Sequence, residues 1–469
     1  MALLAGDVVA ATGGRRVHGR AEQAIDAVSI DSRTVGAGDF FVAIRGERFD
    51  AHRFVADALA RGAGGALVEA AAAGAVQAAT AGHRDAVLIA VDDTTRGLQD
   101  IARDVRRRSG TTVVAITGSA GKTTTKEVAA EFLSTRYRVF RNKGNLNNHI
   151  GLPLSLLELR SRPEVAVVEL GMNHPGEIRT LVGIAEPEVR VWTNVGDAHA
   201  GFFASTDAIA EAKGEILEHA RPGDVLVANA DDSRIAGRAG VFAGRVMTFG
   251  IGHAADVRAT EVEERGLDGI AARVRTPIGD MDLETPLLGL GNLANVLAAI
   301  AVALQFNVPL DDLAATAAAL RAAHRRGELL RLPGGLTLID DSYNSSPAAL
   351  KRALETVKTA TGSARKIAVL GEMLELGDHS MRLHDECGAL AAAVGLDLLI
   401  AVGGVPARTL ADAAVRSGMA EASVAYVGTS ADAAELAAGR TRPGDLVLVK
   451  GSRGIGTDVV VDRLKAEFA

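Results

Sequence analysis

One run of the sequence has an evident chemical use. Residues 117–125 read Thr-Gly-Ser-Ala-Gly-Lys-Thr-Thr-Thr, after an apolar stretch and before a helical one. This strand–loop–helix context is the one a phosphate-binding loop requires, since glycines let backbone N–H groups turn toward phosphate oxygens. Gly118 lies three residues before Gly121, where the standard loop has five. We predict that the loop binds phosphate, with Lys122 at the β- and γ-phosphates and Thr123 on Mg²⁺.

Three further residues have side chains that suit a metal or phosphate site. Glu169 ends an apolar run, where an acid in a phosphate-loop domain is placed to hold Mg²⁺, and a helix cap explains it equally well. His199 lies a few residues past another strand end, and Lys213 lies fourteen residues further on, in an expected helix. From spacing alone, a structural histidine and a solvated lysine are the simpler interpretations.

The run Asp-Asp-Ser-Tyr-Asn-Ser-Ser-Pro at residues 340–347 joins an expected strand end to a helix start. Pro347 suits the first turn of that helix. Asp340 and Asp341 are adjacent acids that repel each other, so the run favours a cation or a hydroxyl-rich ligand. A helix cap is the structural alternative.

Short apolar runs alternate with alanine-rich helical stretches along the chain, which predicts α/β domains with largely parallel sheets. We expect a small N-terminal α/β domain over 1–93, a central phosphate-loop domain over 94–324, and a doubly wound, Rossmann-like domain over 325–469. The region 251–285 reads as β-rich and irregular. Expected strands are 40–44, 66–68, 87–91, 113–116, 165–168, 189–193, 225–228, 336–339, 367–370, 398–402 and 446–449, and expected helices include 98–108, 292–305 and 310–323.

Composition narrows the class of protein. Lys and Arg number 51 against 58 Asp and Glu, which gives a net charge of −7 and argues against a general nucleic-acid binder. Aromatic residues make up only 3%, too few for a base-stacking platform. The single cysteine, Cys387, excludes an internal disulfide framework. With no apolar run near the roughly 20 residues of a bilayer span and no signal peptide, we expect a cytoplasmic protein without membrane partners and, since nothing demands an oligomer, a monomer.

Taken together and in order, these motifs resemble those of the Mur ligases of bacterial peptidoglycan synthesis. The resemblance covers essentially the whole chain, and the Asp-Ser-Tyr-Asn run is the most member-specific part of it. The motifs that carry it are Thr117–Glu127, Asn145–Asn148, Glu169–Met172, Asn194–His199, Lys213–Glu215 and Asp340–Asn344.

The resemblance implies an ATP-dependent amide ligase. In the implied reaction, ATP phosphorylates the C-terminal carboxylate of UDP-MurNAc-tripeptide to an acyl phosphate. The amine of D-alanyl-D-alanine then attacks the carbonyl carbon, giving UDP-MurNAc-pentapeptide, ADP and phosphate. The implied roles are UDP-sugar binding for residues 1–93, ATP binding for 94–324, and dipeptide binding with part of the nucleotide for 325–469.

The resemblance also implies residue roles around the transferred phosphate. Thr123 and Glu169 would hold one Mg²⁺ and His199 a second. Lys213 matches a family lysine that CO₂ carbamylates, which turns a cation into an anion beside the metals. Lys122, Lys213 and His199 are therefore the predicted catalytic residues.

Further residues match binding positions of the family. The predicted ATP contacts are Thr117, Gly118, Ser119, Ala120, Gly121, Lys122, Thr123, Thr124, Asn292, Asn295, Arg326 and Asp341. The predicted substrate contacts are Ser32, Arg33, Asn147, Asn148, Tyr343 and Asn344. The chain departs from the family pattern at three places: Gly291 stands where a histidine is usual beside the adenine segment, Ala51 where a glycine is usual, and Gly454 after the Lys-Gly-Ser-Arg run at 450–453.

Two alternatives stay open from the sequence. One is another member of the superfamily, a folate-type polyglutamate ligase or the sibling that adds the third peptide residue. The uridine-type segment around Ser32 and Arg33 disfavours the first, and the Asp-Ser-Tyr-Asn run disfavours the second. The other alternative is a phosphate-loop nucleotide switch, but that function does not explain the C-terminal doubly wound domain.

Overall fold

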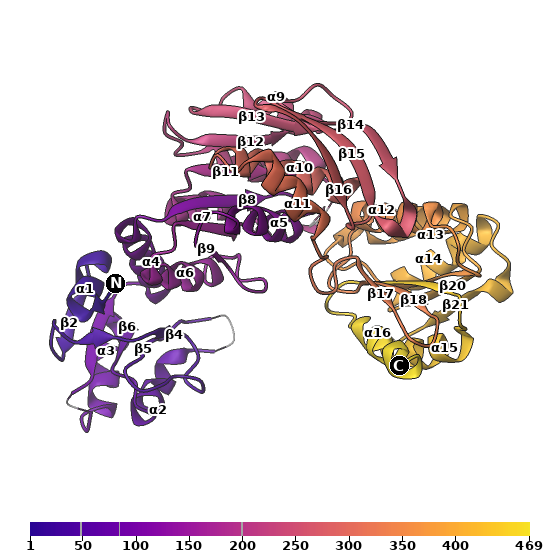
Figure 1. Ribbon diagram of the computed structural model, residues 1–469. Helices are drawn as coiled ribbons and strands as arrows, with labels where there is room; N and C mark the ends of the chain where they lie inside the picture. Colours follow the sequence, from indigo (N-terminus) through magenta and orange to yellow (C-terminus); the bar gives the residue numbers. More distant parts are fainter. Residues whose placement is uncertain (47–48, 84, 198–199) are drawn as a thin grey trace. The chain divides into compact units, whose positions relative to one another are not determined.

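The computed structural model describes residues 1–46, 49–83, 85–197 and 200–469 (Figure 1). Three α/β domains, each built on its own mostly parallel sheet, follow one another along the chain, which confirms the predicted fold class. The chain divides into two compact units. The first comprises Met1–Ala115, Tyr137–Met172 and Gly176–Glu188, and the second comprises Ile116–Arg136, Asn173–Pro175 and Val189–Ala469.

The N-terminal domain has a five-stranded sheet in the order β2-β7-β6-β5-β4, in which only β2 runs antiparallel to its neighbour. A separate antiparallel pair joins β1 to β3. The elements are β1 (Leu3–Leu4), α1 (Ala5–Thr12), β2 (Arg15–His18), β3 (Ala24–Ile25), β4 (Val28–Ser29), β5 (Phe40–Val42), η1 (Ala51–Phe54), α2 (Val55–Ala60), β6 (Gly65–Glu69), α3 (Ala70–Ala79) and β7 (Val87–Val91).

Helix α4 (Thr94–Ser109) follows the N-terminal sheet and illustrates why these residues fold as they do. The Asp93 side chain caps it by accepting hydrogen bonds from two backbone N–H groups, and Gly110 ends it in the left-handed conformation. Leu98, Ile101 and Val105 recur at helical spacing and are fully buried. The helix therefore begins and ends where its capping residues stand.

The central domain has a nine-stranded sheet in the order β16-β15-β14-β13-β12-β11-β8-β10-β9. Strands β11 to β14 run parallel to one another, while β14, β15 and β16 are joined antiparallel. The elements are β8 (Thr112–Thr117), α5 (Lys122–Ser134), β9 (Val139–Arg141), α6 (Gly151–Leu156), η2 (Leu157–Ser161), β10 (Val165–Glu169), α7 (Glu177–Ala185), β11 (Val189–Trp192), η3 (Ala200–Phe202), α8 (Thr206–Gly214), η4 (Glu215–Leu217), β12 (Val225–Asn229), α9 (Ser233–Ala239), β13 (Arg245–Gly250), β14 (Val257–Glu264), η5 (Gly266–Asp268), β15 (Ile270–Thr276), β16 (Gly279–Thr285), α10 (Leu290–Leu304) and α11 (Leu310–Ala318).

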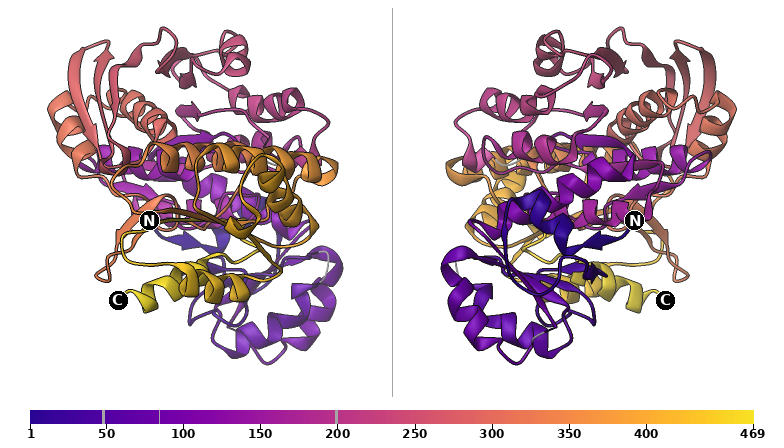
Figure 2. Two further views of the ribbon diagram at one scale, coloured as in Figure 1. Left: turned by 90° about the vertical axis from the view of Figure 1, so that its right-hand side faces the viewer. Right: turned by 90° about the vertical axis from the view of Figure 1, so that its left-hand side faces the viewer.

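Helix α10 is the buried helix of this domain. Its run from Asn295 to Ala303 is buried throughout, and it packs against α5 and strands β12 to β14. Helix α11 of the same domain lies along strand β16, as the views in Figure 2 show. This packing brings the start of α10 close to the start of α5.

The C-terminal domain has a six-stranded sheet in the order β17-β18-β22-β19-β20-β21, parallel except for β17. The elements are β17 (Glu328–Arg331), β18 (Thr337–Asp341), α12 (Pro347–Thr359), β19 (Lys366–Gly371), η6 (Gly377–His379), α13 (Ser380–Ala393), β20 (Leu398–Val402), α14 (Val405–Arg416), η7 (Glu421–Ser423), β21 (Val424–Val427), α15 (Ser430–Arg440), β22 (Leu446–Lys450) and α16 (Asp458–Glu467).

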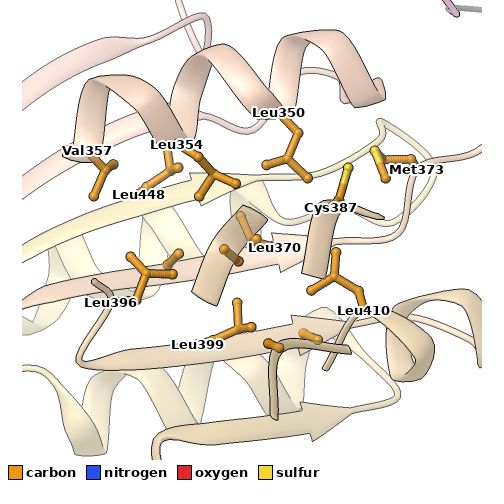
Figure 3. Close-up of a cluster of buried hydrophobic side chains, with 14 of the residues drawn as sticks. Leu350, Leu354, Val357, Leu370, Met373, Cys387, Leu396, Leu399, Leu410 and Leu448 are labelled. Carbon is orange, nitrogen blue, oxygen red and sulfur yellow. The ribbon is translucent and has the colours of Figure 1, made fainter. Parts of the chain in front are cut away.

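A single face of α12 anchors that helix to the C-terminal sheet. Leu350, Leu354 and Val357 point toward Leu370 and Leu448 of the strands beneath them (Figure 3). All five side chains are at most 1% exposed. The opposite face of α12 is left to contact other parts of the protein.

The expected elements differ from the observed ones chiefly at their ends. The helix expected over 310–323 ends at Ala318, because Ala319 and Leu320 close a tighter turn through hydrogen bonds to residues three positions earlier, and this turn buries Leu320. Strands β2, β9, β13, β17 and β21 and the two-residue strands β1, β3 and β4 were not predicted. Across the described residues, every helix is too short or too polar to cross a membrane.

Candidate nucleotide-binding site

The predicted phosphate loop lies between β8 and α5, as the sequence indicates. Gly121 caps the start of α5 with φ 83°, and the Lys122 ammonium donates to the carbonyl oxygen of Gly118 at 2.7 Å. The lysine therefore curls back over its own loop. Thr123 and Thr124 stand in the first turn of α5, where the helix N-terminus favours an anion.

Two glycines of the loop have no room for a side chain. A β-carbon on Gly118 would lie 1.9 Å from Thr193 Oγ1, and one on Gly121 would lie 2.2 Å from Asn295 Oδ1. Both glycines also have positive φ angles, 153° and 83°. The loop thus needs glycine at these positions for space and for backbone conformation.

Asn194, which follows β11, holds the loop from one side. Its side-chain oxygen accepts from the N–H of Ala120 at 2.8 Å, and its side-chain amide donates to the carbonyl oxygen of Ala120 at 2.9 Å. Its own carbonyl oxygen accepts from the N–H of Ser119 at 3.0 Å. The Ser119 hydroxyl in turn accepts from the N–H of Gly196 at 2.9 Å. Asn194 was not a predicted site residue, although its place at a polar strand end is the signal that points to it.

Asn292 and Asn295, predicted to contact the nucleotide, hydrogen-bond to each other and to the protein in this structure. Asn295 Nδ2 donates to Asn292 Oδ1 at 3.2 Å, and Asn295 Oδ1 accepts from the Thr125 hydroxyl at 3.3 Å. Asn292 Nδ2 donates to the carbonyl oxygen of Leu288 at 2.9 Å. These bonds join the start of α10 to α5, so the two asparagines position the helix that follows the loop.

Lys213 lies in α8, whose start is capped by the Ser205 side chain. The lysine is 1% exposed, and among the described residues its ammonium has neither a hydrogen bond nor an ion pair. Burial lowers the pKa of Lys213 well below its ordinary value, and the Lys122 ammonium lowers it further. The chain's single tryptophan, Trp192, packs against the neighbouring Gly214. The structure thus brings the two predicted catalytic lysines into electrostatic reach of each other, Lys213 buried and Lys122 half-buried.

Glu169 ends β10 in the first compact unit and is 2% exposed. Its Oε2 accepts from the Asn147 side chain at 3.3 Å, and its backbone N–H donates to Asn142 Oδ1 at 3.2 Å. Its Oε1 is buried without a hydrogen-bond partner among the described residues. A buried carboxylate oxygen left unpaired in this way suits a cation ligand. The Asn148 side chain instead accepts from the backbone N–H groups of Ile150 and Gly151, at 3.2 and 2.8 Å, in the turn before α6.

The C-terminal domain gathers its predicted residues at the carboxyl end of β18, the end at which open parallel sheets bind ligands. The Lys450 ammonium donates to Asp341 Oδ2 at 2.6 Å and to the Asn344 carbonyl oxygen at 2.9 Å. The Arg326 guanidinium lies 4.0 Å from the centre of the Tyr343 ring. Asp341, Tyr343, Asn344 and Arg326 are therefore brought together, and Lys450 is an addition to them.

Asp340 has a different role from its neighbour. Its side chain is fully buried, and its Oδ1 accepts from the Ser342 hydroxyl at 2.6 Å. Burial raises the pKa of Asp340, although the hydrogen bonds from Ser342 oppose that rise. Asp341 is thus paired with a lysine, whereas burial disfavours the charged form of Asp340.

The first compact unit holds the residues predicted to bind the UDP-sugar. Arg33 is exposed and makes a two-point ion pair with Asp31, at 2.9 and 2.7 Å, beside Ser32. Ala51 stands in η1 with an ordinary backbone conformation, so the glycine usual there is not needed. His199 lies outside the described residues and stays a prediction, as do the other assigned roles.

Three α/β domains, one of which carries a phosphate loop, define a phosphate-loop nucleotide-binding protein. Family models match along its length: "Mur ligase family, catalytic domain" over 24–106, "Mur ligase middle domain" over 116–303 and "Mur ligase, glutamate ligase domain" over 325–453. The chain belongs to the Mur ligase family.

Individual relatives cover nearly the whole chain. The UDP-N-acetylmuramoyl-tripeptide–D-alanyl-D-alanine ligase of Bacillus subtilis is 33% identical over 440 residues, which cover 94% of this chain and 93% of that protein. A crystal structure of MurF from Acinetobacter baumannii is similar with a TM-score of 0.88 and 32% identity over 99% of each chain. The Thermotoga maritima MurF ligase in complex with ADP gives a TM-score of 0.81 and 29% identity over 94% of this chain and 97% of that one.

We expect Gly121→Ala to weaken ADP binding by roughly tenfold or more, since an L-residue there combines a left-handed backbone with a clash against Asn295. Calorimetric titration with ADP measures the effect, and circular dichroism checks the fold. Gly237→Ala is the matched control, because nothing lies within 4 Å of its added β-carbon. Equal ADP affinity of the Gly121 variant and wild type would contradict the observed loop geometry.

The buried Lys213 predicts a pH-dependent stability. Between its lowered pKa in the folded protein and the ordinary value of 10.5, unfolding takes up one proton. The wild-type free energy of unfolding therefore rises with pH in this window, by about 1.4 kcal/mol per pH unit. Lys213→Met lacks this dependence, so the stability of the variant relative to wild type falls as the pH rises through this window toward 10.5. Denaturant unfolding in CO₂-depleted buffer measures the gap, with the exposed Lys358→Met as control; a gap that does not change with pH contradicts the prediction.

Proposed function

We propose that this chain is an ATP-dependent amide ligase that joins D-alanyl-D-alanine to UDP-MurNAc-tripeptide, giving UDP-MurNAc-pentapeptide, ADP and phosphate. The observation that carries the proposal is the likeness, over 94% of the chain, to the UDP-N-acetylmuramoyl-tripeptide–D-alanyl-D-alanine ligase of Bacillus subtilis. The shaped phosphate loop and the strand-end clusters of the other two domains support it. The substrates are small molecules, and we propose a cytoplasmic, monomeric enzyme.

The loop residues supply the positive potential that the reaction needs. A carboxylate must approach the γ-phosphate, so two negative groups have to be held together. Lys122 and the start of α5 offer that charge at the loop. Because Lys122 already rests on the Gly118 carbonyl oxygen, a phosphate exchanges one oxygen partner for another and meets a lysine that is close to its working position.

Magnesium fits the residues proposed to hold it. The unpaired, buried Oε1 of Glu169 is the oxygen that favours a cation most directly. We propose that Thr123 and Glu169 hold one ion, and that His199 and a carbamylated Lys213 hold a second. When bound, the ions neutralise charge on the phosphates.

Carbamylation of Lys213 follows from its surroundings. Only a neutral amine attacks CO₂, forming an N–C bond and releasing a proton to leave an anionic carbamate. Burial and the neighbouring Lys122 ammonium lower the pKa of Lys213 and so favour its neutral amine over the ammonium. Once formed, the carbamate replaces a disfavoured buried cation with an anion beside Lys122.

The three domains take separate roles in this proposal. Residues 1–93 hold the UDP-sugar, with Ser32 and Arg33 near the uracil or pyrophosphate and Asn147 and Asn148 helping to hold the substrate. Residues 94–324 hold ATP, and residues 325–469 bind the incoming dipeptide beside Tyr343 and Asn344. In the same domain, Asp341 faces the ribose and Arg326 the nucleotide.

Phosphate release from ATP with Mg²⁺ tests the proposal, with UDP-MurNAc-tripeptide and D-alanyl-D-alanine added separately and together. We expect release only with both, and a product heavier than the UDP-tripeptide by one dipeptide less water. Lys122→Ala is the negative control. Release that needs neither substrate, or that uses a single amino acid in place of the dipeptide, contradicts the proposal.

We expect Lys213→Ala to lose at least a hundredfold in turnover and to regain part of it with added short carboxylic acids, which supply the missing anion. Turnover of wild type and variant is measured with and without acetate in the same buffer. Lys358→Ala, at an exposed lysine, serves as the control. Full activity of the Lys213 variant, or wild-type turnover that is unchanged in CO₂-depleted buffer, contradicts the carbamate.

A further inference from the structure

Helix α12 turns a second face toward the central domain. Leu350, Leu354 and Val357 bury one face against the C-terminal sheet (Figure 3). Arg352 follows Leu350 by two residues, which turns it by about 200° around the helix axis. Thr356 follows Arg352 by four residues and shares its face. The α12 face with Arg352 and Thr356 is therefore the one left free by the core.

That face rests on the glycines at the start of α10. A β-carbon on Gly289 would lie 2.8 Å from Thr356 Oγ1, and one on Gly291 would lie 2.8 Å from Arg352 Cδ and 3.4 Å from its Nε. The Arg352 side chain thus occupies the space that a side chain at position 291 would need. Gly291 and Arg352 are sterically coupled, so a larger residue at one requires a change at the other.

No described residue makes a direct polar contact with the charged end of Arg352. Across the described residues, its guanidinium has neither a hydrogen bond nor an ion pair, and the side chain is only partly exposed. Burial lowers the pKa of Arg352, while the carboxylates of Asp341 and Glu355 oppose that effect from a distance. An unpaired guanidinium in a half-buried place is costly unless a ligand covers it.

Arg352 lies near the phosphate loop, because Gly291, which it contacts, is on the helix that meets the loop. Asn295 meets Gly121 of the loop, and Gly291 lies four residues earlier on α10, about 6 Å along the helix axis. A nucleotide with its phosphates on the loop has its ribose and base within reach of this point. The negative charge of Asp341, at the end of β18, acts on the same guanidinium.

We propose that Arg352 contacts the base of the bound nucleotide, its side chain lying where a residue larger than glycine at position 291 would stand and its planar guanidinium stacking on the purine ring. Guanidinium planes stack on aromatic rings, and a cation over a π-system is attracted to it. The inference rests on the proposed function only in taking a purine nucleotide as the ligand. It accounts for Gly291 and for the unpaired cation together.

Calorimetric binding of ADP and of inorganic tripolyphosphate to the full chain tests the proposal. Tripolyphosphate engages the loop but has no base. We expect Arg352→Ala to weaken ADP binding roughly 3- to 30-fold and to leave tripolyphosphate binding unchanged. Arg352→Lys keeps the positive charge but lacks the planar guanidinium, so it should recover only part of the lost ADP affinity. The exposed neighbour Lys351→Ala is the matched control and should match wild type for both ligands.

A second pair of variants separates base contact from packing. Gly291→His alone should crowd Arg352 and weaken ADP binding, and combining it with Arg352→Ala should restore affinity above that of either single variant. Equal weakening of both ligands by Arg352→Ala, unchanged ADP binding, or simple addition of the two single effects would each overturn the proposal. ADP binding is measured without turnover, so failure of the ligase assay leaves this test intact.

Discussion

The shape of the phosphate loop depends on β11, the strand beside it. Thr193 fills the space over Gly118. The Asn194 side chain hydrogen-bonds to both the N–H and the carbonyl oxygen of Ala120, and the Asn194 carbonyl oxygen accepts from the N–H of Ser119. Two loop N–H groups are thereby used by protein, not by ligand. Phosphate recognition passes to Lys122 and the first turn of α5, which suits a loop two residues shorter than the standard one.

This arrangement places two lysine side chains within electrostatic reach of each other, one half-buried on the loop and one buried. Lys122 sits on the loop and Lys213 is buried within its electrostatic reach, with no carboxylate partner for Lys213 among the described residues. A positive charge on Lys213 is unfavourable in the free protein, which is why its pKa is lowered, and it becomes less unfavourable once anions bind. The site therefore selects ligands that bring negative charge, as a nucleotide, a carboxylate substrate or a lysine carbamate does.

The sequence predicted those features of the structure that depend on residues close together in the chain. Apolar runs ending in polar residues located most strands, and the glycine-rich run between strand and helix located the loop. The bonds of Asn194, the pairing of Lys450 with Asp341 and the coupling of Gly291 to Arg352 join residues far apart in the chain, so no spacing could reveal them. The depressed pKa of Lys213 likewise depends on burial that only the fold supplies. In the sequence, Gly291 is a departure from the histidine that is usual at this position, and in the structure the Arg352 side chain occupies the space beside it.

The measurement that tests the central claim most directly is the ADP affinity of Asn194→Ala by calorimetry, with hydrogen exchange across α5 to report the loop. Removing the side chain deletes two hydrogen bonds, each worth about 1 kcal/mol, and leaves the β8–α5 loop without its grip. The account predicts a loss of affinity of roughly tenfold or more, with faster exchange at the start of α5 and an unchanged overall fold. Wild-type affinity with wild-type exchange would show that the loop keeps its shape without β11, which would contradict it.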